Sequence, residues 1–419
     1  MNRLVLLSVV VLCACPPPPA KPCDRTKVGN ICTVAGEGSN GYSGDDGPAL
    51  EAEMSLPQDT LTADDGTIYI LDWNNHRIRK VTTDGKMVAV AGRGELGGTL
   101  DDPANSDFNH PTGMVFDSAG NIHVAAWHNS KIRKLEVATG TITDTCGDGR
   151  RAYFGDGAEA MKASLDLPTS IAFDPQGNLV IMDQANMVIR QISPTGTISL
   201  RAGRCVIDAA PPSGPGPCAS GVDPVACPMN SGKFTCGVPA DTCSKPCTPS
   251  YFGDEGPASA MRIAQPFGQS ADPGGRIVFD TAGNLFFADS TNAIIRKIDL
   301  QGNVHRIAGT APVAGVAQRG YAGDEGPATS AQLNNPVDLA FDDEGTLFFT
   351  DTYNHCVRSI DSAGVIHTVA GKCGTAGTTG DDGPAKDALL KRPYGLEWNK
   401  GTLLISDTGN NRIRVIKLK

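Results

Sequence analysis

Residues 320–371 read GYAGDEGPATSAQLNNPVDLAFDDEGTLFFTDTYNHCVRSIDSAGVIHTVAG, and this stretch decides the fold because its pattern recurs along the chain. Its landmark is an Asp, a short turn, and then an apolar residue followed by Arg. The Arg is present in all six copies and the Asp in five, because Ala126 replaces it in the second copy. The Arg residues are Arg79, Arg133, Arg190, Arg296, Arg358 and Arg414. Repeats of this length are typical of propellers and solenoids.

Each copy contains four short runs rich in β-branched and aromatic residues, separated by Gly, Asp and Asn turns. In the first copy these runs cover residues 58–62, 67–71, 77–81 and 87–91. Four antiparallel strands per copy predict an all-β, six-bladed β-propeller. Residues 31–36 resemble the outermost strand of a copy, and the last copy stops after its third strand. We therefore expect the N-terminal strand to complete the last blade, so that residues 31–419 close into a ring without an exposed edge.

The motifs GDDGPA, LNNPVDLAFD, GTLFFTDTYNH and NNRIRVI resemble NHL repeats, a family of six-bladed propellers. The linker motif is similar to that of bacterial NHL proteins and of the propeller in teneurins. The resemblance covers about residues 31–419 except for one insertion, and it implies the fold. It implies no single function, because the family includes protein-binding, RNA-binding and lyase members.

The first residues have the pattern of an export signal. Residues 1–14 hold one Arg and then an apolar run that is too short to span a bilayer. The end of this run, LCAC, resembles a bacterial lipobox, which implies that Cys15 is lipidated and becomes the first mature residue. Residues 15–30, with four consecutive Pro, then form a stiff tether. The alternative is ordinary cleavage near Ala14 or Ala20 without lipid.

Composition limits the partners. Hydrophobic residues make up 40% of the 419 residues, enough for a sizeable core, and 49 Gly and 29 Pro indicate many turns. The formal net charge is −10, which argues against nucleic acid or an anionic membrane surface as the main partner. We expect a monomer whose membrane contact is the lipid anchor alone.

Cysteine usage agrees with an oxidising compartment. Residues 204–250 interrupt the linker between the third and fourth blades and hold six of the 13 Cys, with few large apolar residues. This insertion needs disulfides because it cannot build a core, and its candidates are Cys205, Cys218, Cys227, Cys236, Cys243 and Cys247. A cross-linked loop on a rigid ring is a natural recognition element. Five further Cys (Cys23, Cys32, Cys146, Cys356, Cys373) make the mature total odd, so at least one thiol is free or pairs outside the chain.

The repeated Arg is predicted to be structural. A linker acid recurs with it once per copy, at Asp45, Asp101, Asp156, Asp254, Asp324 and Asp381. We expect an Arg–Asp lock between blades, in preference to a ring of anion ligands. The acidic, Gly-rich linkers are an alternative calcium site, but their spacing lacks the ordered ligands of an EF-hand. No other cofactor or metal is expected.

Function is more probable where the copies differ. One slot near the start of each first strand lines the central channel, and it holds Asp59, Gly113, Ser170, Arg276, Asp338 and Gly395. Two acids, one Arg and one Ser predict a small-ligand or cation site at the channel mouth. The alternative is a water-filled channel in which Asp and Arg pair with one another. Residues 267–274 are extra in the fourth blade and are candidates for a lid.

The second blade contains His110, His123 and His128. Their slots place them at different heights, so catalysis by all three together is not favoured. We interpret Trp127 and His128 as a surface contact patch, with Trp73 in the corresponding slot of the first blade. No nucleophile elbow, phosphate loop or zinc signature is present in the sequence.

These observations predict a non-enzymatic, exported lipoprotein scaffold that binds a protein or glycan partner at the cell envelope through propeller loops and the Cys-rich insertion. The alternative is an envelope lyase or hydrolase that acts at the channel mouth around Asp59, Arg276 and Asp338. RNA binding conflicts with both export and negative charge.

Overall fold

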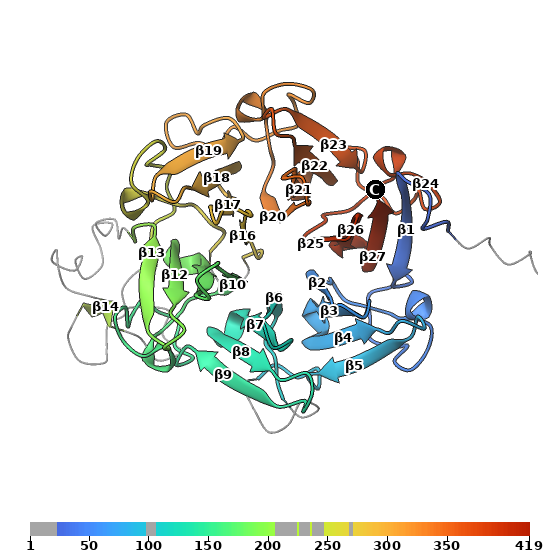
Figure 1. Ribbon diagram of the computed structural model, residues 1–419, viewed down its shortest axis with the longest axis horizontal. Coiled ribbons are helices and arrows are strands. Elements are labelled where there is room, and N and C mark those ends of the chain that lie inside the picture. The colour runs from blue at the N-terminus through green and yellow to red at the C-terminus, as the bar shows by residue number, and fades with distance from the viewer. Residues whose placement is uncertain (1–22, 98–105, 206–223, 226–234, 237–246, 268–270) are drawn as a thin grey trace, which may run out of the picture.

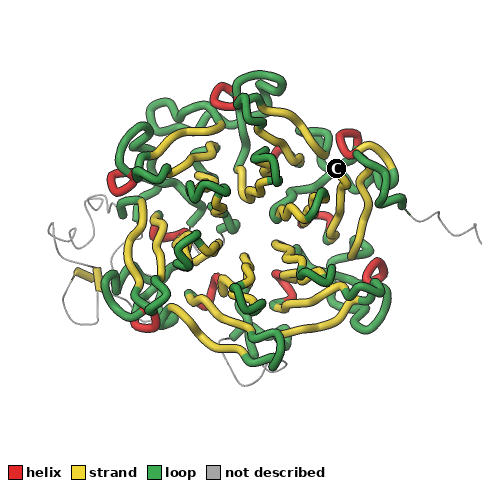
Figure 2. Tube along the Cα trace, viewed as in Figure 1, coloured by secondary structure: helices red, strands yellow, loops and turns green. Residues whose placement is uncertain are grey.

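Six β-sheets surround a common axis in the computed structural model (Figures 1 and 2). It describes residues 23–97, 106–205, 224–225, 235–236, 247–267 and 271–419. Each blade is antiparallel, and its first strand lies innermost. The predicted all-β, six-bladed propeller is confirmed. The predicted lipidation site Cys15, the predicted signal and the first part of the predicted tether lie outside the described residues.

The blades follow one another along the chain. The first three consist of β2 (Asp59–Thr62), β3 (Ile68–Asp72), β4 (Arg77–Val81) and β5 (Met87–Ala91); β6 (Pro111–Phe116), β7 (Ile122–Ala126), β8 (Lys131–Leu135) and β9 (Ile142–Cys146); and β10 (Pro168–Phe173), β11 (Leu179–Asp183), β12 (Val188–Ile192) and β13 (Ile198–Ala202). The next two consist of β16 (Ile277–Phe279), β17 (Leu285–Asp289), β18 (Ile294–Ile298) and β19 (Val304–Ala308); and β20 (Pro336–Phe341), β21 (Leu347–Asp351), β22 (Cys356–Ile360) and β23 (Ile366–Ala370).

The sixth blade joins the two ends of the described chain. It contains β25 (Leu396–Asn399), β26 (Thr402–Asp407), β27 (Arg412–Lys417) and, outermost, β1 (Asn30–Ala35). β1 pairs antiparallel with β27, with Ile31 opposite Ile416 and Cys32 opposite Val415. The short β24 (Gly383–Pro384) pairs with the other edge of β1. This pairing is the closure that the sequence predicts.

The core lies between neighbouring blades. Alternate side chains of each strand face the blade before and the blade after, so each gap is filled from two sheets. For example, Phe287 of β17 packs with Val180 and Met182 of β11 in one buried cluster. The linkers contribute Ala residues from short 3-10 turns, such as Ala49 in η1 (Ala49–Glu51). Among the described residues, no helix is long and apolar enough to cross a membrane.

The two ends of the propeller axis differ. At one end, 3-10 turns join the second and third strands: η2 (Trp73–Asn75), η3 (Trp127–Asn129), η5 (Gln184–Asn186), η8 (Thr352–Asn354) and η10 (Thr408–Asn410). An Asn in each copy donates its side-chain N–H to a linker carbonyl, as Asn75 does to Gly41 at 2.7 Å and Asn354 to Gly320 at 2.7 Å. We call the turns and these linker segments the loop face. The opposite end carries short Asp-Gly turns of nearly uniform length.

Candidate functional site

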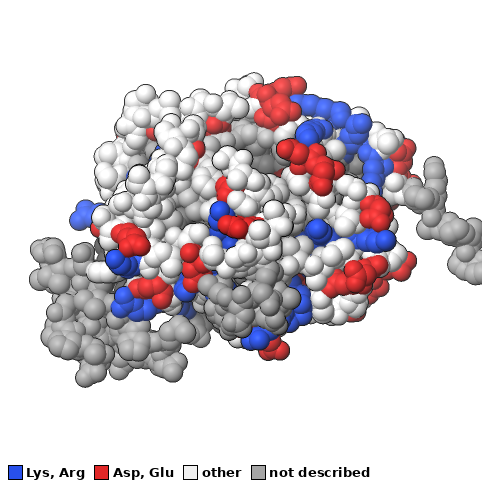
Figure 3. Space-filling view, turned by 60° about the horizontal axis from the view of Figure 1, so that its bottom comes forward, with Lys and Arg blue, Asp and Glu red and all other residues white. Residues whose placement is uncertain are grey.

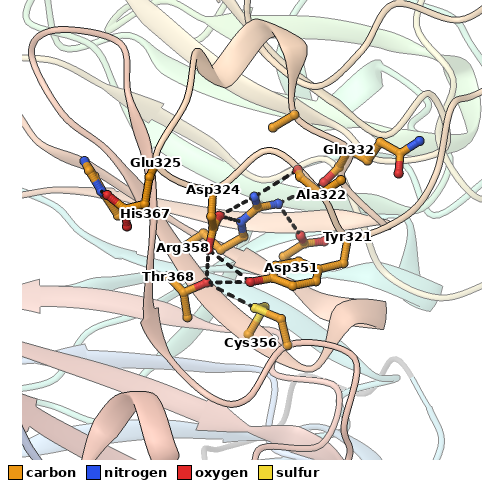
Figure 4. Close-up of polar contacts among 12 residues, drawn as sticks. Tyr321, Ala322, Asp324, Glu325, Gln332, Asp351, Cys356, Arg358, His367 and Thr368 are labelled. Atoms are coloured by element: carbon orange, nitrogen blue, oxygen red, sulfur yellow. Dashed lines mark hydrogen bonds and ion pairs between the residues drawn. A yellow bond between two sulfur atoms is a disulfide. The ribbon is translucent and has the colours of Figure 1, made fainter.

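The repeated Arg is fully buried and holds two acids. In the fifth blade, Arg358 donates from Nε to Asp324 at 3.0 Å and from NH1 to Asp351 at 3.1 Å (Figure 4). It also donates to the Gln332 carbonyl at 2.9 Å. Asp324 and Gln332 belong to the linker and Asp351 ends β21, so Arg358 clamps the linker against its blade.

This clamp recurs with the predicted residues. The linker pairs are Arg79–Asp45, Arg190–Asp156, Arg296–Asp254, Arg358–Asp324 and Arg414–Asp381. The landmark Asp supplies the second carboxylate, at Asp72, Asp183, Asp289, Asp351 and Asp407. Sequence reasoning found this acid as a landmark but gave it no role. The buried, fully engaged Arg side chains are not available to a ligand, which argues against a ring of anion sites.

In the second blade the repeated Arg pairs with an acid of the fourth strand. Ala126 removes the landmark carboxylate, and Asp101 lies outside the described residues. Arg133 instead donates to Asp144 of β9 at 3.0 Å, and its NH1 donates to the Asp107 carbonyl. Lys131 also contacts Asp144. A carboxylate from the fourth strand therefore replaces the one missing from the second.

Two of the channel slot residues, Arg276 and Asp59, contact each other near the axis. Arg276 donates to Asp59 at 2.8 Å and to the carbonyls of Gln58, at 3.2 Å, and Thr112. It thereby reaches from the fourth blade to the first and second. Burial raises the pKa of Asp338 to about 7, although the Arg276 charge opposes this shift. Burial likewise raises the pKa of Asp59 against the pull of Arg276.

The kind of residue in the channel slot alternates from blade to blade around the ring. In the first, third and fifth blades a side-chain oxygen accepts an N–H from the next blade: Asp59 from Met114 at 2.8 Å, Ser170 from Ile277 at 3.1 Å and Asp338 from Leu396 at 2.9 Å. In the second and sixth blades, Gly113 and Gly395 leave room for the next blade's backbone. A Cβ there would lie 2.8 Å from the Thr169 oxygen and 2.4 Å from the Gln58 oxygen.

The prediction of an accessible ligand site at the channel mouth is therefore wrong, because its residues are buried. Asp59, Ser170, Arg276 and Asp338 are 3–6% exposed, and each is engaged by the next blade or by another member of the slot. Their physical task is to join inner strands whose edges lack strand partners. The pairing of Asp with Arg that the sequence left as an alternative is present, in a closed network.

Residues 266–267 and 271–274, which we call the strap, lie beside the turns of the loop face. Gln184 of η5 binds the strap at both ends, donating to the Pro266 carbonyl at 2.6 Å and accepting from the Gly274 N–H at 3.2 Å. Asp272 accepts from Arg392 of the sixth blade at 2.8 Å and from the Tyr353 hydroxyl of the fifth blade. Ala271 packs against the buried cluster of Trp127, Leu167 and Ala185, as Trp73 does. The described part of the predicted lid, which excludes 268–270, thus contacts the third, fifth and sixth blades.

The sequence led us to expect Trp127 in an exposed contact patch, and this expectation is wrong. Its side chain is 1% exposed because Leu167 and Ala185 of the third blade pack on it. His128 is half-buried and stacks on the Trp127 ring, with centroids 4.2 Å apart. Sequence reasoning could not see this burial because the covering residues belong to the next blade.

Three histidines gather beside the two tryptophans. His110 lies between His76 of the first blade and His128, with ring centroids 4.4 and 4.8 Å away. Burial lowers the pKa of His110 to about 3 and that of His128 to about 4, and neighbouring positive charges add to the shift. Burial also lowers the pKa of His76. These imidazoles are therefore neutral at pH 7.

His123, the third histidine of the second blade, lies elsewhere. It contacts Asp117 at 3.4 Å and packs edge-on against Phe173 of the third blade. The separation expected for His123 is present. The same expectation is wrong for His110 and His128, whose Nδ1 atoms lie 3.1 Å apart. The approach of His76 to His110 was missed. The only available signal was that Trp73 and Trp127 share a slot.

Within the described residues, no group of three or more His, Cys, Asp or Glu is arranged to hold a metal ion. The linker acids considered for calcium are engaged by the Arg clamps, and a linker Tyr hydroxyl also donates to each of Asp156 and Asp324, at 2.6 and 3.1 Å. Their oxygen atoms are thus already partnered.

Disulfides link Cys23 to Cys32, Cys205 to Cys247 and Cys356 to Cys373. The second of these closes the base of the insertion. Cys146 is free and buried, and burial raises the pKa of its thiol to about 12, so it is unreactive. The side chains of Cys218, Cys227, Cys236 and Cys243 lie outside the described residues.

Comparison with known proteins supports the predicted resemblance. Residues 303–379 match the family described as "Teneurin NHL domain". The chain is 25% identical over 339 residues to "Protein SUPPRESSOR OF QUENCHING 1, chloroplastic" of Arabidopsis thaliana, covering 79% of this chain and 27% of that protein. It is 24% identical over 424 residues to mouse Teneurin-1, covering 92% of this chain and 13% of that protein. The chain thus spans less than a third of either relative.

Solved structures show the same fold at low identity. A Bacteroides thetaiotaomicron protein described as of unknown function superimposes with a TM-score of 0.59 at 14% identity, covering 92% of this chain and 75% of that one. A second protein of that bacterium, titled an auxiliary nutrient binding protein, gives a TM-score of 0.56 at 13% identity with the same coverage. Both likenesses concern the propeller alone.

Proposed function

We propose that this protein is a non-enzymatic binding scaffold that holds a protein or glycan partner on its loop face. The observation that carries the proposal is the position of the irregular features. The strap, the His–Trp group and the Cys205–Cys247 base of the insertion all lie on the loop face or beside its linkers. The opposite end keeps its short, uniform turns, which offer nothing specific to recognise.

A rigid ring suits recognition by a preformed surface, since little freedom is lost on binding. The Arg clamps fix each linker to its blade, the slot residues join neighbouring blades, and β1 closes the ring. The nutrient-binding title of one structural neighbour is consistent with this role. Figure 3 shows acidic and basic side chains interspersed on the displayed side, with no single extended basic area to favour nucleic acid.

We further propose that export and lipidation at Cys15 place this scaffold at the bacterial envelope, at the outer membrane, and that the insertion of residues 204–250 contributes to partner capture. The lyase or hydrolase alternative is no longer favoured. Its reacting groups, Asp59, Arg276 and Asp338, are buried and engaged in joining blades.

Site-specific photo-crosslinking tests the choice of face. A benzophenone side chain at Val316, which is 64% exposed in a loop-face linker, is compared with one at Ala282 in an exposed turn of the opposite end. We expect adducts with envelope protein or glycan from the Val316 position and at least fivefold fewer from Ala282.

Equal labelling from both positions would overturn the assignment of the face. Deleting the insertion while keeping the ring provides the second arm. We expect the ring to stay folded by circular dichroism, and adduct formation at Val316 to fall. Unchanged adducts would remove the insertion from the proposal.

A further inference from the structure

Four rings at the inner end of the loop face form a closed circuit. Trp73 lies 4.5 Å from His110, His110 lies 4.8 Å from His128, and His128 lies 4.2 Å from Trp127, measured between ring centroids. The widest side joins Trp127 back to Trp73 at 6.2 Å. Trp73, His110 and His128 are half-buried, so the circuit reaches the surface. It combines residues from two blades with cover from a third.

Hydrogen bonds fix which nitrogen of His128 carries the proton. His110 Nδ1 lies 2.8 Å from Asn109 Oδ1, which only accepts, so His110 Nδ1 is protonated. His128 Nδ1 faces that same nitrogen at 3.1 Å and must therefore accept. A neutral His128 then carries its proton on Nε2. This nitrogen is a donor that takes no part in the contact with His110.

Three N–H donors of the circuit have no acceptor among the described residues. They are Trp73 Nε1, Trp127 Nε1 and His128 Nε2, all of them buried. Buried donors in native proteins are nearly always satisfied, by protein or by ordered water. These three donors therefore call for acceptors from outside the described residues.

We propose that Trp73, Trp127 and His128 form a subsite for the carboxylate of an acidic sugar, a uronate unit of a glycan. This inference rests on the proposed binding function and names its ligand class. A carboxylate offers two oxygens that only accept, matching donors that only donate. A neutral sugar hydroxyl would bring a proton that itself needs an acceptor. The half-buried faces of Trp73 and His110 suit the C–H groups of a sugar ring.

The subsite itself is uncharged. Burial lowers the pKa of His110 and of His128, so both imidazoles are neutral at pH 7. Arg151, whose charge opposes protonation of His128, is already paired, because its Nε donates to the buried Asp166 at 2.6 Å. The subsite therefore binds by N–H donation.

Tryptophan fluorescence provides a direct readout because the chain has only three Trp, two of them in the circuit. The full chain is titrated with galacturonic acid trisaccharide and, separately, with the neutral galactose trisaccharide. We expect saturable quenching by the acidic sugar and at least tenfold weaker binding of the neutral one. Trp73→Phe, which keeps an aromatic side chain and removes the N–H, should weaken acidic-sugar binding at least fivefold.

Trp398 supplies the matched control. Its Nε1 is also buried without a partner, but it stacks on Phe348 near the turn at the opposite end of the propeller. Trp398→Phe should leave the Kd for the acidic sugar unchanged. Equal affinity for the two sugars, an unchanged Kd in Trp73→Phe, or no binding of the acidic sugar would overturn the inference. If crosslinks from Val316 persist in any of these cases, only the subsite is refuted and the proposed binding function is still supported.

Discussion

The repeated Arg shows how one residue per copy holds the architecture together. Arg358 is fully buried, yet it has two carboxylates and two linker carbonyls as partners. A buried charge is tolerated only when it is paired and hydrogen-bonded in this way. Because one of its partners comes from the linker, the pair fastens the connection between blades rather than a single sheet.

Removal of the buried acid should therefore be costly. Asp351→Ala leaves Arg358 with one carboxylate and also removes the acceptor of the Asn334 N–H at 2.7 Å. We expect the free energy of unfolding to fall by about 3–5 kcal/mol, measured by urea denaturation. Asp343→Ala, at an exposed turn of the same blade, should change it by less than about 0.5 kcal/mol. Similar losses in both variants would contradict a specific clamp.

The histidines should affect stability with opposite pH dependences. Burial lowers the pKa of His110 to about 3. The contribution of neutral His110 to the free energy of unfolding is therefore complete above the unfolded pKa near 6.5, and it is lost as the pH falls below that value. The pKa of His305 is raised by its hydrogen bond to Asp299, so its contribution is complete below 6.5 and is lost as the pH rises through the folded pKa.

Thermal midpoints of His110→Gln and His305→Gln, each compared with the unmodified chain, check these signs. The advantage of the unmodified chain over His110→Gln should shrink from pH 7 to pH 5. Its advantage over His305→Gln should shrink from pH 6 to pH 8 and should be smaller throughout, because His305 is partly exposed to solvent. Slopes of the same sign in the two comparisons would refute the assignment.

At the scale of elements, the innermost strands are joined in a pattern that alternates from blade to blade. Asp59, Ser170 and Asp338 each reach across to a backbone N–H of the following blade. The slots between them hold Gly113, Arg276 and Gly395. The two glycines have no side chain in the path of the next strand, and Arg276 extends instead toward the axis. The ring thus has a threefold order of blade pairs beneath its sixfold appearance.

This order predicts a steric role for Gly113. In Gly113→Ala the new Cβ would meet the Thr169 oxygen of the third blade at 2.8 Å, and backbone cannot swing aside as a long side chain can. We expect a loss of about 1–3 kcal/mol in the free energy of unfolding from overpacking. Gly256→Ala is the control, because the nearest atom there is 3.6 Å from the added Cβ. An unaffected Gly113→Ala would show that the blades can separate freely at the axis.

At the scale of the whole molecule, the sequence predicts whatever repeats. The landmark Arg, the strand runs and the unfinished last copy depend on local spacing, and they suffice to place six blades and their closure. Contacts that join different copies are another matter. Trp127 is buried by Leu167 and Ala185 of the next blade, and His76 reaches His110 across a blade boundary. Spacing within one copy carries no information about such pairs.

The same limit explains the channel slot. Counting back along each first strand identified Asp59, Ser170, Arg276 and Asp338 correctly as neighbours at the axis. It did not reveal that their acceptors and donors are used by adjacent backbone, because that depends on how closely the inner strands approach. Polar residues at equivalent positions of a repeat protein can thus resemble a ligand site while they serve to satisfy strand edges.

Ring closure makes the N-terminal strand essential to the whole propeller. A chain that begins at residue 37 would lack β1 and leave the edge of β27 open to pairing with another chain. It would also lose the buried Ile31 and Val34, which contribute about 3–6 kcal/mol together at about 1.5–3 kcal/mol each. We expect this chain to aggregate or to unfold at much lower urea, measured by light scattering and circular dichroism. A chain that begins at residue 23 keeps β1 and the Cys23–Cys32 bond, and it should behave as the full-length protein does. A monomeric chain from residue 37 with unchanged stability would mean that five complete blades and one open sheet hold the ring by themselves.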